Sequence, residues 1–142
     1  MTGLQKNCVV VPIDFSDISF TALETALEYV DHPSKVHIIH VLEPLPVNEP
    51  GMMWNTINDE TRKQNALKAL HQKFNDPKFQ EIKIELKIGN PSEQILNQAK
   101  ELKADLIVIS SHGTDHAISR FLMGSVTERV IRYSQCPVLV LR

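Results

Sequence analysis

The sequence lacks an excess of charge of either sign. Its 15 Lys and Arg residues stand against 17 Asp and Glu residues, which gives a formal net charge of −2. Proteins that bind nucleic acid through their overall field carry a basic excess, usually gathered on one face. The charge balance therefore argues against a nucleic-acid partner.

Long apolar segments are also missing. A membrane-spanning helix needs about 20 consecutive apolar residues, whereas the apolar run at 8–13 is followed at once by Asp14. The same short run cannot form the apolar centre of a secretory signal. We therefore expect a cytoplasmic protein with no membrane partner.

Cysteine is scarce, with only Cys8 and Cys136 in the chain. Disulfides belong mainly to exported proteins, and no export signal is evident here. We interpret both residues as buried small apolar side chains, and a disulfide between them is the less favoured alternative.

Short apolar runs alternate with longer segments of helical periodicity. Strands are predicted at 8–13, 36–42, 81–88, 104–110 and 137–142, and helices at 17–30, 59–74, 91–102 and 126–134. This alternation predicts an α/β fold, a doubly wound five-stranded parallel sheet with helices on both faces. The length suits a single domain over 1–142. The strand at 81–88 alternates polar with apolar residues, so we place it near a sheet edge.

Two helix starts carry recognisable capping signals. Ser16 precedes an apolar helical period and can cap it through its side-chain oxygen. Asn90, Pro91 and Glu93 combine a cap, a proline at the first helical position and a capping-box partner.

The arrangement predicts where a ligand would bind. In doubly wound sheets, ligands lie beyond the carboxyl ends of the strands, where the strand order reverses. Gly113 and the pair Gly124–Ser125 follow the fourth strand, and glycine lets backbone N–H groups converge on a phosphate. The pair also precedes the last helix, whose positive end attracts anions. Alternatively, Gly113 only makes a turn and Ser125 only caps the helix.

Three stretches resemble the universal stress protein family, and the similarity extends over the whole chain. They are VVVPIDFSDISFTALETAL at 9–27, HVLEP at 40–44, and SSHG with GSVTERVIRYSQCPVLVLR at 110–113 and 124–142. The resemblance implies a Rossmann-like fold of the adenine nucleotide α-hydrolase type. It also implies a stress-response or regulatory protein that binds ATP or a related adenine nucleotide, with or without Mg²⁺.

The family's nucleotide-binding branch resembles the pattern G-x2-G-x9-G-[ST], and this pattern maps onto the segment from Ser110 to Ser125. The resemblance also implies contacts to the adenine from the end of the first strand and from Val41. The predicted nucleotide site therefore comprises Pro12, Ile13, Asp14, Val41, Ser110, His112, Gly113, Gly124, Ser125 and Val126.

The chain departs from the family pattern at two points. Ser110 replaces the first glycine, and ten residues at 114–123 separate Gly113 from Gly124 where the pattern has nine. The serine Cβ restricts close approach of a ligand to the backbone. The extra residue can be absorbed as a bulge or can disturb the phosphate loop. A universal stress protein that binds no nucleotide and acts only through protein contacts is therefore an alternative.

Asp14 and the histidines allow more than one interpretation. Asp14 can contact the nucleotide or serve as an ordinary turn residue, and the resemblance favours the first. His37 and His40 are three apart on a strand and point to opposite faces, so we expect no metal site. His112 and His116 flank the glycine loop, where a phosphate contact competes with plain solvation. Because no base–nucleophile pair stands out, we expect no catalytic residues, with slow ATP hydrolysis as an alternative.

The last predicted strand, at 137–142, can lie at a sheet edge with unpaired backbone, which favours pairing across a two-fold axis. The family resemblance implies the same homodimer. Met52, Met53 and Trp54 form an apolar cluster that either folds onto the protein's own core or contacts a partner protein.

Overall fold

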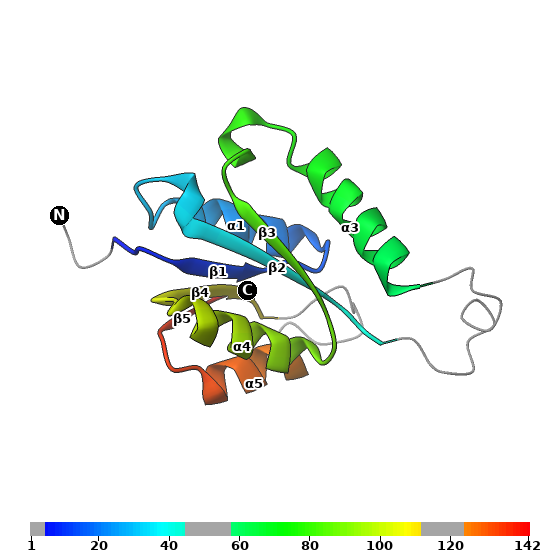
Figure 1. Ribbon diagram of the computed structural model, residues 1–142. Coiled ribbons are helices and arrows are strands. Elements are labelled where there is room, and N and C mark those ends of the chain that lie inside the picture. The colour runs from blue at the N-terminus through cyan, green and yellow to red at the C-terminus, as the bar shows by residue number, and fades with distance from the viewer. Residues whose placement is uncertain (1–4, 45–57, 112–123) are drawn as a thin grey trace.

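The computed structural model describes residues 5–44, 58–111 and 124–142 (Figure 1). Strands and helices alternate along these ranges, as the sequence predicts. The elements are β1 (Val9–Pro12), α1 (Asp17–Leu27), β2 (Val36–Leu42), α3 (Asp59–Lys73), β3 (Lys83–Ile88), α4 (Pro91–Leu102), β4 (Leu106–Ser110), α5 (Ser125–Tyr133) and β5 (Val138–Leu141). The apolar cluster at Met52, Met53 and Trp54 lies outside the described residues.

All five strands are parallel and lie in the order β3-β2-β1-β4-β5. The chain adds β2 and β3 on one side of β1, then crosses back to add β4 and β5 on the other side. Helices α1 and α3 cover one face of the sheet, and α4 and α5 cover the other (Figure 1). This is the predicted doubly wound fold, and β3 is an edge strand as its alternating pattern indicated.

Strand β1 supplies side chains to two apolar cores. Val9 and Val11 pack toward α1, whereas Val10 packs toward α4 and α5. All three are fully buried. A strand covered on both faces needs apolar residues at every position, which explains its unbroken β-branched run. The helices contribute core residues to both faces of the sheet. These are Ala22, Leu23, Ala26 and Leu70 on one face, and Ile95, Ala99 and Val130 on the other.

The predicted caps of α1 and α4 are confirmed. The side chain of Ser16 accepts a hydrogen bond from the N–H of Ser19, and that of Asn90 accepts one from the N–H of Glu93. At α5 the alternative in which Ser125 caps the helix is wrong. Gly124 occupies the cap position without a side-chain hydrogen bond, and Ser125 is the first helical residue.

Both cysteines are free thiols, but they are half-buried and not fully buried as expected. Burial, and next the nearby Asp105 carboxylate, raises the pKa of the Cys8 thiol. A raised pKa keeps the thiol protonated at neutral pH, which makes it a poor nucleophile. Cys8 is therefore a packing residue.

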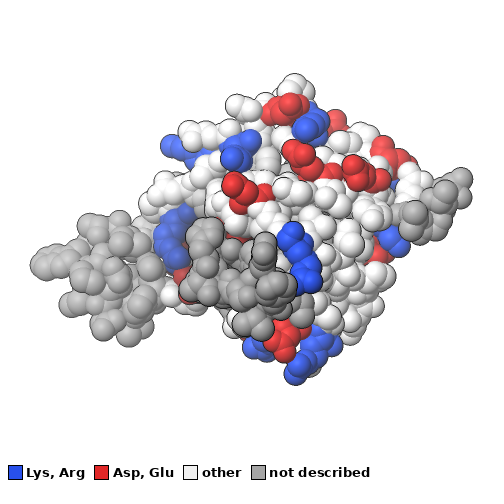
Figure 2. All heavy atoms as spheres, turned by 180° about the vertical axis from the view of Figure 1, so that it is seen from behind, with Lys and Arg blue, Asp and Glu red and all other residues white. Residues whose placement is uncertain are grey.

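The surface mixes charges of both signs. In Figure 2 the Lys and Arg side chains alternate with Asp and Glu side chains over the visible part of the face, without a broad patch of one sign. Within the part of the chain that the structure describes, no helix combines the length and apolar character of a membrane span.

Two residues other than glycine have a positive φ, Phe15 at 68° and Lys103 at 53°. Lys103 follows α4, where its N–H donates to Lys100 O at 3.1 Å and the N–H of Ala104 donates to Ala99 O at 2.9 Å. This is the Schellman arrangement, whose left-handed position is usually glycine because a Cβ is unfavourable there.

We predict that Lys103→Gly raises the free energy of unfolding by about 0.5–1 kcal/mol. Release of the left-handed strain outweighs the entropy that glycine adds to the unfolded chain. Urea denaturation measures the change. The matched control Lys100→Gly, inside α4, should lower the same free energy by about 1 kcal/mol. A lower urea midpoint for Lys103→Gly would contradict the prediction.

Candidate functional site

A cavity of about 290 Å³ opens at the carboxyl edge of the sheet, beside the ends of β1, β2 and β4. Strand order reverses between β1 and β4, so the cavity lies at the position where doubly wound folds bind ligands. Its lining residues are Pro12, Ile13, Asp14, Ile39, His40, Val41, Glu43, Pro91, Ile95, Ile109, Ser110, Gly124, Ser125, Val126 and Thr127.

Most of the residues that the sequence assigned to a nucleotide site meet at this cavity. Those that line it are Pro12, Ile13, Asp14, Val41, Ser110, Gly124, Ser125 and Val126. The remaining two, His112 and Gly113, lie outside the described residues, as does His116. Three segments far apart in the sequence therefore contribute to one cavity.

Asp14 has two roles in the turn between β1 and α1. Its Oδ1 accepts hydrogen bonds from the N–H of Ser16, at 3.0 Å, and from the Ser16 hydroxyl. Its own N–H approaches Ser19 Oγ at 3.4 Å. No donor in residues 5–44, 58–111 or 124–142 reaches Oδ2. One carboxylate oxygen thus fixes the turn, while the other has no hydrogen-bond donor among the described residues.

His40 holds the end of β1 in place. Its Nδ1 lies 2.6 Å from Ile13 O, and because a carbonyl only accepts, Nδ1 carries the proton of this hydrogen bond. The N–H of Ile13 donates to Ile39 O at 2.9 Å. Both backbone polar groups of Ile13 are therefore fixed by β2.

The ring of Phe15 packs edge-on against the His40 ring, with centroids 4.9 Å apart. Phe15 also contacts Phe20 of α1, at a centroid distance of 6.2 Å. These contacts hold Phe15 at its φ of 68°, a conformation that aromatic residues rarely adopt. Sequence analysis missed this conformation, because such turns usually contain glycine or asparagine.

Hydrogen bonds join the end of β4 to the start of α5. Thr127 Oγ1 donates to Ser110 O at 2.6 Å, and the N–H of Gly124 donates to Ser111 O at 2.7 Å. The carbonyl of Gly124 accepts the first intrahelical bond, from Glu128. The N–H groups in the first turn of α5, before Glu128, have no intrahelical acceptor. They form the positive end of the helix dipole. They belong to residues that line the cavity, so they offer an anion site there.

Apolar side chains form the opposite wall of the cavity. Ile39 and Ile109 come from the sheet, and Pro91 and Ile95 come from α4. Sequence analysis missed these residues because an apolar side chain that lines a cavity has the same pattern as one in the core. The cavity therefore has an apolar side and an end rich in N–H donors, which suits a ligand with an apolar ring and an anionic group.

Within residues 5–44, 58–111 and 124–142, two carboxylates line the cavity, those of Asp14 and Glu43. Among the residues that can be described, no group of three or more His, Cys, Asp and Glu side chains could hold a metal ion. His37 lies outside the cavity lining, and burial, followed by the charge of Lys83, lowers the pKa of its imidazole.

Comparison with known proteins gives a consistent result over almost the full chain. The sequence model of the universal stress protein family matches residues 7–142. The universal stress protein MJ0531 of Methanocaldococcus jannaschii is 34% identical over 139 residues, which cover 94% of this chain and 81% of that protein. Universal stress protein YxiE of Bacillus subtilis is 30% identical over 148 residues, covering 96% and 99%.

Two solved structures extend the comparison. MJ0577 of Methanocaldococcus jannaschii superposes with a TM-score of 0.75 at 26% identity, covering 95% of this chain and 94% of that chain. A universal stress protein in complex with cAMP superposes with a TM-score of 0.59 at 25% identity, covering 97% and 98%. The fold, the family match and these relatives agree, and the chain belongs to the universal stress protein family.

Proposed function

We propose that this universal stress protein binds an adenine nucleotide, ATP or a related compound, in the cavity at the carboxyl edge of the sheet. The observation that carries the proposal is the convergence of the ends of β1 and β4 with the first turn of α5 on one cavity. The complex of a relative with cAMP supports an adenine nucleotide as the ligand class.

The chemistry of the lining suggests how such a ligand would lie. We expect the base to pack against Ile39, Val41 and Ile95, and the phosphates to accept from the first turn of α5. Asp14 Oδ2 is an acceptor for a sugar hydroxyl. Should Mg²⁺ accompany the phosphates, carboxylate oxygens are the ligands that it prefers, and Asp14 and Glu43 would supply them.

The role that we propose is regulatory and not catalytic. Among the described residues, the cavity lining contains no recognisable base–nucleophile pair. We further propose that residues 1–142 form one domain that acts in the cytoplasm. Ser110 is the reason to keep a protein that binds no nucleotide as the second candidate, because its side chain adds bulk where the family pattern has glycine.

We predict that Gly124→Val abolishes nucleotide binding. Gly124 has φ −66° and ψ 158°, values open to any residue, so the valine does not strain the turn. Its side chain would instead occupy space beside the first turn of α5. In a thermal-shift titration, ATP with Mg²⁺ at 100 times its dissociation constant should stabilise the wild type by about 2.7 kcal/mol. The variant should show no such shift.

Thr21→Val, on the exposed side of α1, is the matched control and should bind as the wild type does. Equal stabilisation of Gly124→Val by ATP would mean that the nucleotide binds elsewhere. No stabilisation of the wild type at millimolar ATP would favour the second candidate.

We predict that His40→Phe weakens nucleotide binding and that His40→Asn largely restores it. Phenylalanine keeps a ring against Phe15 but loses the donor to Ile13 O, whereas the asparagine amide can place a donor near the Nδ1 position. One lost hydrogen bond corresponds to about tenfold in the dissociation constant. Isothermal titration calorimetry measures this constant, and equal affinities for the two variants would rule out positioning by the hydrogen bond.

We also propose that the protein is a homodimer joined through the C-terminal strand at 137–142. Strand β5 lies at the edge of the sheet. The carbonyl of Pro137 accepts a hydrogen bond from Ile107 of β4, and that of Leu141 accepts one from Ser111, just after β4. The alternation along the strand therefore directs the backbone polar groups of Val138 and Val140 outward. This open edge can pair with its two-fold copy.

We predict that Val140→Pro converts the dimer to a monomer. Proline removes an outward N–H group but leaves the hydrogen bonds to β4 in place. Light scattering coupled to size exclusion should give about twice the chain mass of 16.1 kDa for the wild type and the single-chain mass for the variant. Leu139→Thr, a matched β5 control that keeps every N–H, should remain dimeric. A dimeric Val140→Pro protein would place the interface elsewhere.

A further inference from the structure

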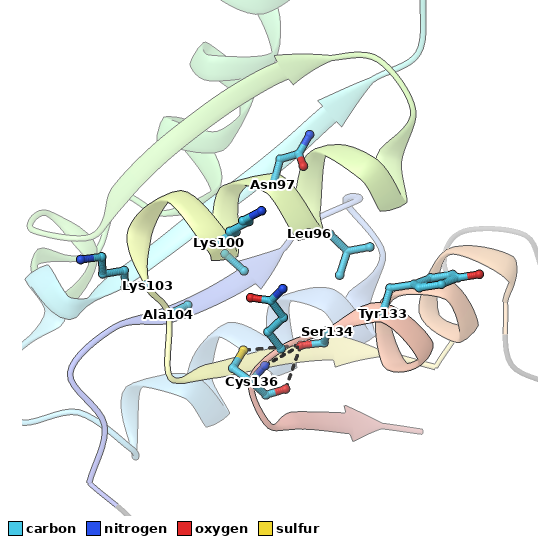
Figure 3. Close-up of a pocket in the computed structure, with 10 residues that line it drawn as sticks. Leu96, Asn97, Lys100, Lys103, Ala104, Tyr133, Ser134 and Cys136 are labelled. Atoms are coloured by element: carbon cyan, nitrogen blue, oxygen red, sulfur yellow. Dashed lines mark hydrogen bonds between the residues drawn. The ribbon is translucent and has the colours of Figure 1, made fainter.

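A second cavity, of about 490 Å³, lies between the C-terminal half of α4 and the turn that joins α5 to β5 (Figure 3). It is larger than the cavity proposed for the nucleotide and shares no lining residue with it. The C-terminal ends of α4 and α5 lie at the amino edge of the sheet, opposite the first cavity. Whatever binds here is therefore separate from the nucleotide.

All the formal charge of this second cavity's lining is positive. Lys100 and Lys103 both line it, and no Asp or Glu side chain of the described part of the chain does. Neither lysine forms an ion pair or a side-chain hydrogen bond with another described residue. By contrast, Lys35 and Lys87 are paired with carboxylates. The cavity thus presents two uncompensated cations.

Lysines near a helix C-terminus also complement the helix dipole, so charge alone does not define a site. The conformation of Lys103 adds a second observation. It occupies the left-handed position of the Schellman turn, with φ 53° and ψ 47°, where glycine would be more stable. Residues kept in an unfavourable backbone conformation concentrate at functional sites. Here the strained residue is one of the two cations at the cavity.

The remaining lining is apolar at the base and polar at the rim. Apolar surface comes from Leu96, Ala99 and Ala104. Tyr133, a residue that is 60% exposed, lies at one end of the cavity (Figure 3). The opposite wall is held in shape because Ser134 Oγ donates to Cys136 O at 2.8 Å and accepts from the N–H of Cys136 at 3.2 Å. A preformed wall lowers the entropy lost on binding.

We propose that this second cavity binds a small organic anion, an acidic group attached to an aromatic or aliphatic body. The volume lies within the range of about 300–1,000 Å³ that small-molecule sites occupy. The body packs on Leu96, Ala99 and the Tyr133 ring, and the acidic group lies beside Lys100. In Figure 3 the Lys103 side chain points away from the other labelled residues, and rotation of this exposed side chain brings its ammonium to the same acidic group. This site is independent of the proposed nucleotide site, so either can exist without the other.

The test uses 2-naphthoate as the anionic probe and 2-naphthamide as its neutral counterpart, titrated into the ¹⁵N-labelled full chain. Naphthoate should shift the backbone amide signals of residues 96–104 and 133–136, whereas naphthamide should bind at least several-fold more weakly. Lys100→Gln and Lys103→Gln should each weaken naphthoate about threefold, as expected for one exposed charge. Lys68→Gln, an exposed lysine on α3, is the matched control and should change nothing.

Several outcomes would overturn the proposal. Equal affinity for the two probes would show an apolar groove without anion selectivity. Unchanged affinity for naphthoate in both lysine variants would show that Lys100 and Lys103 do not bind its acidic group. Naphthoate shifts confined to the ends of β1 and β4 would place the only anion site at the first cavity. Because Lys100 and Lys103 are exposed, thermal melting should confirm that both glutamine variants remain folded.

Discussion

Strand β1 is paired on both edges and covered on both faces, and the rest of the fold depends on this burial. It pairs with β2 and with β4, so the backbone polar groups of Val9 and Val10 are used within the sheet. The pairing with β4 covers only these two residues, so the β1 and β4 strands part toward the carboxyl edge. The connection from β1 to β2 passes through α1 on one face of the sheet, and the connection from β3 to β4 passes through α4 on the other. Such a change of face leaves a crevice at the carboxyl edge. The cavity at the carboxyl edge is therefore a consequence of topology before any site residue is considered.

Side-chain hydrogen bonds then set the shape of this cavity. His40 fixes Ile13, Ser16 fixes one oxygen of Asp14, and Thr127 ties the start of α5 to the end of β4. Phe15 has a positive φ, a conformation that costs about 1–3 kcal/mol in a residue other than glycine. Its ring contacts with His40 and Phe20, together with the hydrogen bonds of Asp14, oppose that cost.

The sequence predicts the helices and strands more completely than it predicts the residues that line the first cavity. Strand β2 was predicted at 36–42 and found at Val36–Leu42, because a short segment rich in Val and Ile is typical of a strand even with two histidines in it. Glycine and serine in the segment from Ser110 to Ser125 signalled the polar end of the cavity. Its apolar wall was missed, since Ile95 and Ile109 satisfy a core pattern equally well. The positive φ values of Phe15 and Lys103 were also missed, because tertiary contacts and helix termination impose them on residues that do not favour them.

The two cavities obtain positive charge in different ways from the same two helices. The N-termini of α4 and α5 adjoin the first cavity, where the first-turn N–H groups of α5, which has no side-chain cap, supply a fixed partial charge. The C-termini adjoin the second cavity, where the helix dipoles place partial negative charge. Among the described lining residues, the positive charge at that cavity comes from Lys100 and Lys103. Exposed lysine charges are screened within about 8 Å at physiological salt, whereas backbone N–H groups at a partly buried helix end are screened less. An anion at the second cavity therefore depends on two side chains, while one at the first depends mainly on the backbone that the fold itself sets in place.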